Sequence, residues 1–163
     1  MKRWGVIGTI LLLLIGVPPT IAATVPAITG NATLVEWCSQ AHCGTARFSG
    51  GFAGSIAGSY RLGTVGVAVT HTPLAPQAGG IAQITGGDWR LDVPENSWRG
   101  LPAYHFRGSV AGGTIVTNGD GTYTVTATLV LPPGSYGPGG TLSAGGVLNH
   151  NTFPPTLKVQ LGP

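Results

Sequence analysis

The chain has 163 residues, of which 28 are Gly and 13 are Pro, while charged residues supply only 8%. This composition excludes a long-helix protein or coiled coil, and the hydrophobic content of 42% is too high for a disordered, highly charged chain. Without Lys2 and Arg3 the formal net charge of +3 falls to +1, and the remaining arginines are scattered. A nucleic-acid partner is therefore not expected, because such binding needs clustered basic residues.

The first 23 residues have the organisation of a secretory signal peptide. Lys2 and Arg3 precede an apolar stretch over 6–17, two prolines follow, and small residues end the segment at Ala23. A membrane-spanning helix needs about 20 apolar residues, so we expect a cleaved leader rather than a retained anchor. The sequence thus predicts a secreted protein, extracellular or periplasmic, with no stable membrane insertion after cleavage.

The mature chain begins with a short segment that has no strand pattern. Residues 24–32 are small, polar and proline-containing, which predicts an exposed lead-in to one domain over 33–163. Cys38 and Cys43 are the two cysteines, and an even pair in an exported chain predicts a disulfide. A redox pair would prefer closer spacing and a zinc site would need further ligands, so we expect neither a metal nor a cofactor.

From residue 33 onward the dominant hydrophobic period is two, which is typical of strands with one apolar face. The pattern is clearest over 122–131, where Tyr123, Val125 and Ala127 alternate with threonines. Glycine-rich turns at 57–59, 86–87 and 118–121 predict antiparallel pairing. The strands expected in chain order are 33–37, 45–53, 55–61, 64–70, 80–85, 88–93, 104–110, 113–117, 122–131, 140–148 and 157–161.

These features predict an all-β fold, a single antiparallel up-and-down β-barrel, with a two-sheet β-sandwich as the alternative. An α/β fold is excluded because no 10-residue stretch of the mature chain has a helical period free of Gly and Pro. An outer-membrane barrel is not expected, because its strands would be longer and bracketed by two aromatic girdles.

Candidate binding residues follow from positions that strand alternation does not explain. Trp98 lies in the loop over 94–102, so we expect it either to cap a barrel mouth as part of a binding site or to pack down and close the end of the barrel. Arg47 and His105 are the polar groups expected at the rim, and Tyr104 completes the candidate ligand-binding set.

The other titratable residues form no recognisable catalytic or metal-binding motif. His71 continues the apolar face of its strand, whereas His105 lies on the opposite face, so one pocket is not expected to hold both. In a barrel enzyme, an isolated polar residue such as Arg47, His71, Asp88 or His105 would act inside an apolar lumen.

Three functions remain open from the sequence. The preferred one is non-catalytic binding of a small apolar molecule in the lumen or at its rim. The second is a barrel enzyme of isomerase or cyclase type acting on a substrate held in the lumen. The third is a cell-surface or matrix component with a filled barrel and a surface polymer as partner.

Overall fold

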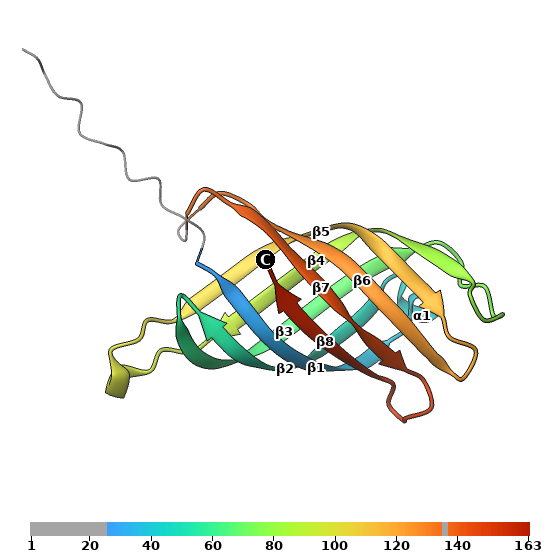
Figure 1. The fold of residues 1–163 in the computed structure, drawn as a ribbon, viewed down its shortest axis with the longest axis horizontal. Helices are drawn as coiled ribbons and strands as arrows, with labels where there is room; N and C mark the ends of the chain where they lie inside the picture. The colour runs from blue at the N-terminus through green and yellow to red at the C-terminus, as the bar shows by residue number, and fades with distance from the viewer. Residues whose placement is uncertain (1–25, 135–136) are drawn as a thin grey trace, which may run out of the picture.

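The computed structural model describes residues 26–134 and 137–163, which form a closed barrel of eight antiparallel strands (Figure 1). The strands are β1 (Ile28–Cys38), β2 (Ala46–Ile56), β3 (Ser59–His71), β4 (Ile81–Val93), β5 (Tyr104–Thr117), β6 (Thr122–Leu131), β7 (Gly140–Asn149) and β8 (Thr156–Gly162). Each strand pairs with the next, and β8 closes the ring on β1. The predicted up-and-down barrel is confirmed, and the sandwich is excluded. The predicted signal peptide, residues 1–23, lies outside the described residues.

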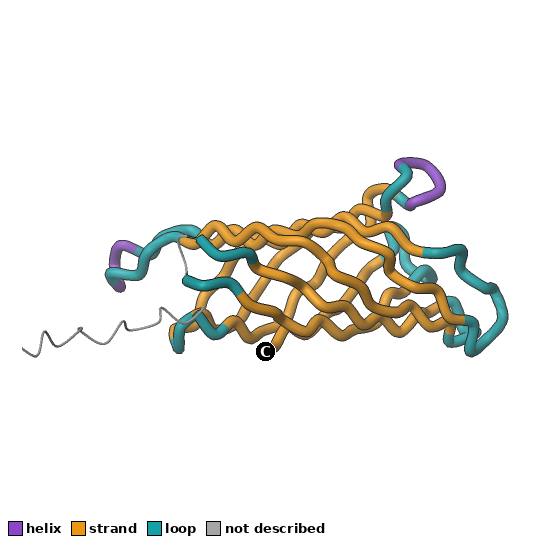
Figure 2. Tube along the Cα trace, turned by 90° about the horizontal axis from the view of Figure 1, so that it is seen from above, coloured by secondary structure: helices purple, strands orange, loops and turns teal. Residues whose placement is uncertain are grey.

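Two short helices occupy connections at opposite ends of the barrel (Figure 2). Helix α1 (Gln40–Cys43) joins β1 to β2, and the 3-10 helix η1 (Ser97–Arg99) lies between β4 and β5. The connections β3–β4, β5–β6 and β7–β8 share the end that carries α1. No helix in the described part of the chain is long and apolar enough to cross a membrane.

The strands are fewer and longer than predicted. The expected segments 80–85 and 88–93 are one strand, β4, and 104–110 and 113–117 are likewise one strand, β5. Residues 55–61 are divided between β2 and β3 by a tight turn in which Ala57 and Gly58 have positive φ. The prediction that 24–32 is an exposed lead-in is wrong for its last five residues, because β1 begins at Ile28 and this side chain is fully buried.

The glycine pairs predicted to break strands instead lie inside them. Gly86–Gly87 and Gly112–Gly113 have φ between 153° and 158°, an extended conformation that residues with a Cβ rarely adopt. The β4–β5 ladder is interrupted at these pairs, and it resumes in the same register on both sides. The glycines therefore bend two neighbouring strands without ending them, which is what closure of a small barrel requires.

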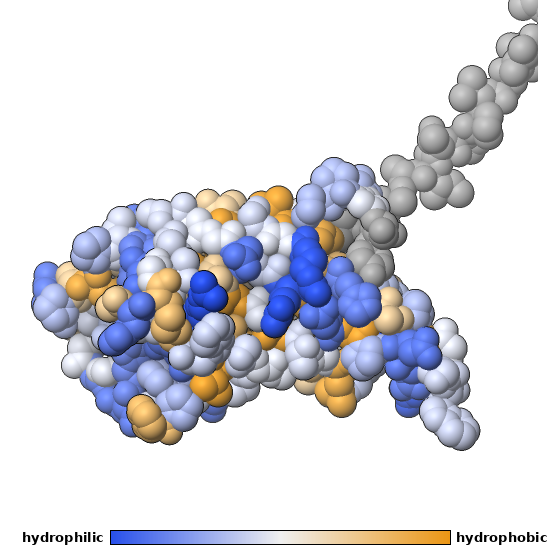
Figure 3. Space-filling view, turned by 180° about the vertical axis from the view of Figure 1, so that it is seen from behind, coloured by the Kyte–Doolittle hydropathy of each residue, from blue (hydrophilic) through white to orange (hydrophobic). Residues whose placement is uncertain are grey.

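Side chains alternate between an apolar interior and a polar exterior, as predicted. Val65, Val67 and Val69 of β3 point inward, and the threonines at 124, 126 and 128 of β6 are exposed on the outside. The face seen in Figure 3 is a mosaic of hydrophilic and weakly hydropathic residues, with hydrophobic ones in small separate groups. The apolar surface of the molecule is thus gathered mainly inside the barrel.

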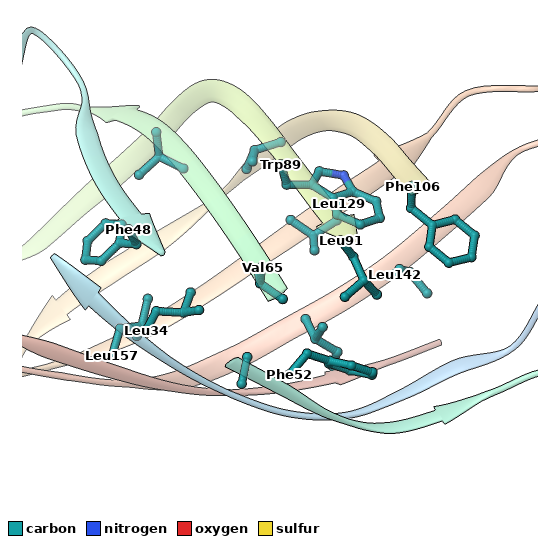
Figure 4. Close-up of a cluster of buried hydrophobic side chains, with 14 of the residues drawn as sticks. Leu34, Phe48, Phe52, Val65, Trp89, Leu91, Phe106, Leu129, Leu142 and Leu157 are labelled. Carbon is teal, nitrogen blue, oxygen red and sulfur yellow. The ribbon is translucent and has the colours of Figure 1, made fainter. Parts of the chain in front are cut away.

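The end of the lumen away from α1 is filled by the chain itself. Phe52 and Phe106 are almost completely buried there, and Figure 4 shows both pointing into the barrel. The buried Arg61 closes this end, since its Nη2 donates to the carbonyl of Pro102 at 2.8 Å and to that of Pro94. Its guanidinium also lies 5.4 Å from the centre of the Tyr104 ring. The lumen is consequently blind at this end.

Candidate functional site

The other half of the lumen contains a cavity of about 230 Å³ lined by side chains from all eight strands. Its wall is mostly Val, Leu, Ile, Phe and Trp, and four inward positions carry alanine: Ala32, Ala46, Ala127 and Ala144. Small residues at positions that a larger side chain could fill leave the space open. A dry apolar cavity of about 150 Å³ accepts benzene, so this one has room for roughly ten non-hydrogen atoms.

The polar residues of the cavity lining are concentrated at the α1 end. They belong to the segment that ends β1 and forms α1, to the last residue of β3, and to the residue that follows β7. The five are Glu36, Ser39, Gln40, His71 and His150. The cavity therefore has an apolar body and one polar mouth.

Glu36 carries a carboxylate into this mouth because it continues the inward-facing row of Ala32 and Leu34 on β1. Its side chain is 9% exposed, and its Oε2 lies 3.3 Å from His150 Nε2, forming a salt bridge when the imidazole is protonated. The His150 ring packs against Tyr123 at 5.0 Å between ring centres. A carboxylate this enclosed needs such a partner, since burial of a lone charge is costly.

Helix α1 lies at the rim of the mouth and is fastened to the end of β3. The Gln40 side chain donates from Nε2 to the His71 carbonyl at 2.9 Å and accepts from the His71 backbone N–H at 2.8 Å. Gln40 and Ala41 thereby become part of the cavity lining. We call α1 the lid and its two hydrogen bonds to the end of β3 the latch.

The predicted disulfide between Cys38 and Cys43 is confirmed, and it spans the base of this lid with a Cα–Cα distance of 6.1 Å. Gly44 ends the helix at φ 71°, with its N–H donating to the Gln40 carbonyl. The disulfide joins the end of β1 to the last residue of α1, so it limits how far the lid can move. A disulfide is also compatible with an extracellular protein.

The structure places none of the four predicted ligand-binding residues on the cavity lining. Trp98 is fully exposed on η1 at the opposite end, and Arg47 is on the outer face of β2, 5.5 Å from the centre of the Trp37 ring. His105 is on the outer face of β5, and Tyr104 faces the closed end beneath Arg61. The four residues are not brought together, and their binding role stays a prediction.

The expected separation of His71 from His105 is confirmed. Among the polar residues weighed for a barrel enzyme, His71 lines the cavity, whereas Asp88 and His105 are on the exposed outer wall. His71 Nδ1 lies 2.7 Å from the Thr72 carbonyl, and a carbonyl only accepts, so Nδ1 carries a proton there.

Glu36 and His150 were missed by the sequence analysis, although alternation carried the signal. Inward positions on β1 recur at Ala32 and Leu34, which places residue 36 on the same face. The inward row of β7 includes Leu148, and extension by two residues reaches position 150, just beyond the strand. Extending the two-residue alternation along β1, and by one further step past the end of β7, would have identified both residues.

On the outer wall, Asp92 forms a small charged cluster. Arg107 Nη2 donates to Asp92 Oδ1 at 2.8 Å, and His105 Nδ1 lies 2.9 Å from the same oxygen. The Arg107 hydrogen bond lowers the pKa of Asp92 below its usual value, partial burial opposes this, and the His105 contact adds to the lowering. This exposed cluster is separate from the cavity.

No protein-family model, curated protein or solved structure matches this chain. Within residues 26–134 and 137–163, no group of three or more His, Cys, Asp or Glu residues is placed to hold a metal ion.

Proposed function

We propose that the mature protein is a secreted carrier that binds one small, largely apolar molecule inside the barrel. The observation that carries this proposal is the cavity of about 230 Å³, apolar along its body and open in one half of an otherwise packed lumen. Filling it with side chains would stabilise the fold, because empty apolar volume forfeits packing energy. Four alanines on the wall leave this volume unfilled, which supports binding of a ligand there.

The polar exterior supports the same proposal. Outward positions carry mainly threonine, serine, glycine and charged residues, with exposed exceptions such as Leu62, Ile81 and Val147, whereas the buried apolar side chains face the lumen. A barrel that inserts in lipid has the reverse arrangement, with an apolar band outside and a polar interior. A water-facing wall around an apolar cavity suits transport or storage of a poorly soluble compound outside the cell.

The test uses two volume-filling variants of the purified mature chain and a fluorescent lipophilic probe of about ten non-hydrogen atoms, the size that the cavity admits. Ala144 lines the cavity, so a larger side chain there should fill it. We expect Ala144→Leu to weaken probe binding and Ala144→Phe to weaken it further. The matched control is Ala53→Phe, on the outer face of β2. We expect the control to bind like the wild type.

Each variant is checked by thermal unfolding, because overpacking a barrel can cost about 1–3 kcal/mol. The proposal is contradicted if folded Ala144→Phe binds the probe as tightly as Ala53→Phe. It is also contradicted if the wild type binds no lipophilic probe at all.

A second candidate function is proton-transfer isomerisation of a substrate held in the same cavity. One observation favours it: Glu36 and His150 place a proton acceptor and a proton donor 3.3 Å apart at the cavity mouth. Such a pair could remove a proton from one carbon and return it to another without an oxidant. Transformation of a bound compound that stops in Glu36→Gln, while binding persists, would establish this function over simple carriage.

A further inference from the structure

The chemistry of the cavity mouth narrows the class of molecule that the cavity accepts. We propose that the ligand is a small amphiphile, an alcohol or amine of roughly ten non-hydrogen atoms in all, whose apolar body fills the cavity and whose head group donates a hydrogen bond to Glu36. This inference rests on the proposed function, since it assumes that the cavity is occupied. Beyond the carrier function, the inference specifies the polarity of the ligand and its orientation in the cavity.

The orientation follows from the distribution of polar groups. Deep in the lumen the wall is formed by residues such as Trp89, Leu91 and Leu129, and the polar lining residues are all at the α1 end. A polar head placed at depth would lose its hydration without gaining a partner, at a cost of a few kcal/mol. The head therefore lies at the mouth, beneath α1.

The chemistry of the ligand's head group follows from which donors and acceptors of the mouth residues are already engaged in hydrogen bonds within the protein. The contact with His150 involves one oxygen of Glu36, and a carboxylate can accept several hydrogen bonds. In its neutral form the His71 ring, with Nδ1 donating to the Thr72 carbonyl, offers an acceptor at Nε2. Two residues of the mouth, on strands separated only by β2, thus present acceptors.

The donors on the lining are largely committed within the lid. Gln40 uses its amide to latch α1 to the His71 backbone, and the Ser39 hydroxyl lies 2.8 Å from His42 Nδ1. Glu36 is the only carboxylate among the cavity-lining residues of the described chain, so a second carboxylate beside it would meet a like charge. A donor head is favoured and a fatty acid is disfavoured.

The experiment compares four ligands matched in number of non-hydrogen atoms: nonan-1-ol, nonylamine, 1-methoxyoctane and octanoate. Binding to the mature protein is followed by the fluorescence of Trp89, the cavity-lining tryptophan of the described residues, with calorimetry as an independent measure. The ether accepts but cannot donate, so comparing it with the alcohol isolates the hydrogen bond to the head group. Octanoate tests the like-charge argument.

We expect the alcohol and the amine to bind roughly ten-fold or more tightly than the ether and octanoate. In Glu36→Gln the advantage of the amine over octanoate should fall to within roughly three-fold, since the amide keeps the size of the side chain but removes its charge. Glu95→Gln, in the exposed β4–β5 loop, removes an equal charge at the opposite end and should leave the ligand order unchanged.

Retained binding of 1-methoxyoctane by Glu36→Gln shows that the variant still has a formed lumen. If the variant fails to fold, Glu36→Asp supplies the second test, because a shortened carboxylate should weaken alcohol and amine binding while leaving ether binding unchanged. Equal binding of all four ligands, or an unaltered ligand order in both Glu36 variants, overturns the head-group inference but leaves the carrier function standing. Failure of all four to bind overturns the carrier function itself.

Discussion

Single residues decide whether the barrel can close and, in the proposed carrier, which head group its mouth binds. A Cβ built on Gly113 would lie 2.0 Å from the Thr126 carbonyl oxygen, and its φ of 153° is in a region that side chains disfavour. The neighbouring strand can approach this closely only because the position is glycine. The glycine content of the chain thus has a specific structural use at this bend.

Gly113→Ala is expected to lower the free energy of unfolding by roughly 2 kcal/mol or more, through steric overlap and backbone strain together. The matched control is Gly51→Ala on the outer face of β2, where a Cβ would meet no atom within 4 Å. That change should be neutral or slightly stabilising, because it reduces the entropy of the unfolded chain. Urea unfolding of both variants gives the comparison, and equal midpoints would contradict the role assigned to Gly113.

Asp92 gives a pH-dependent prediction. Its pKa is lower in the folded protein than the usual value of an aspartate, so its contribution to stability is present above that usual value and is lost as pH falls through the lowered pKa. Asp92→Asn should therefore cost up to about 1 kcal/mol at neutral pH, as expected for a surface cluster, and nothing at strongly acidic pH.

The measurement for Asp92 is the unfolding free energy of wild type and variant across an acid titration. Asp88→Asn, on the same outer face of β4, controls for the loss of one negative charge. A difference between wild type and Asp92→Asn that stays constant into acid would show that the Asp92 carboxylate is not the cause.

At the scale of elements, the latch between α1 and β3 should set how quickly a ligand exchanges. Gln40 donates one hydrogen bond to the His71 backbone and accepts one from it, which holds α1 at the rim of the mouth, and each bond contributes about 1 kcal/mol. Gln40→Ala should therefore speed probe release roughly ten-fold or more. Stopped-flow dissociation measures this rate, Gln160→Ala on the outside of β8 is the control, and unchanged release from Gln40→Ala would show that α1 is not a lid.

The elements also show how much of this structure could be predicted from its sequence. Period-two patterns located part of each of the eight strands, and over 122–131 they also gave the inward face, because one side of that strand is apolar. The number of strands was overestimated, since a glycine pair such as Gly86–Gly87 signals a turn or a bend equally well and only the register of the neighbouring strand distinguishes the two. The sequence therefore predicted a closed up-and-down barrel but not the lengths of its strands.

The candidate site was harder to predict, because it is assembled from strand ends that are distant in sequence. Glu36 and His150 are 114 positions apart by their numbers and meet because β7 and β1 end at the same rim. Trp98 was selected for its loop position, yet η1 extends from the opposite end of the barrel. Alternation assigns a residue to a face, but the end of the barrel at which a loop lies depends on counting strands correctly.

At the scale of the whole molecule, the barrel is divided along its axis. One half is closed by Phe52, Phe106 and the Arg61 hydrogen bonds, and the other contains the cavity and its latched lid. This division separates the part that stabilises the fold from the part available to a ligand. The most direct test of the carrier proposal is therefore to find which residues a bound ligand contacts.

The measurement that locates the ligand is the set of intermolecular nuclear Overhauser effects between nonan-1-ol and the methyl groups of the mature protein. The account predicts effects to Val67, Val125 and Ala127, which line the cavity, with the hydroxyl end nearest the residues of the mouth. Effects confined to outward-facing methyl groups such as those of Leu62 and Val147, or no effects at saturating ligand, would contradict a ligand-binding lumen.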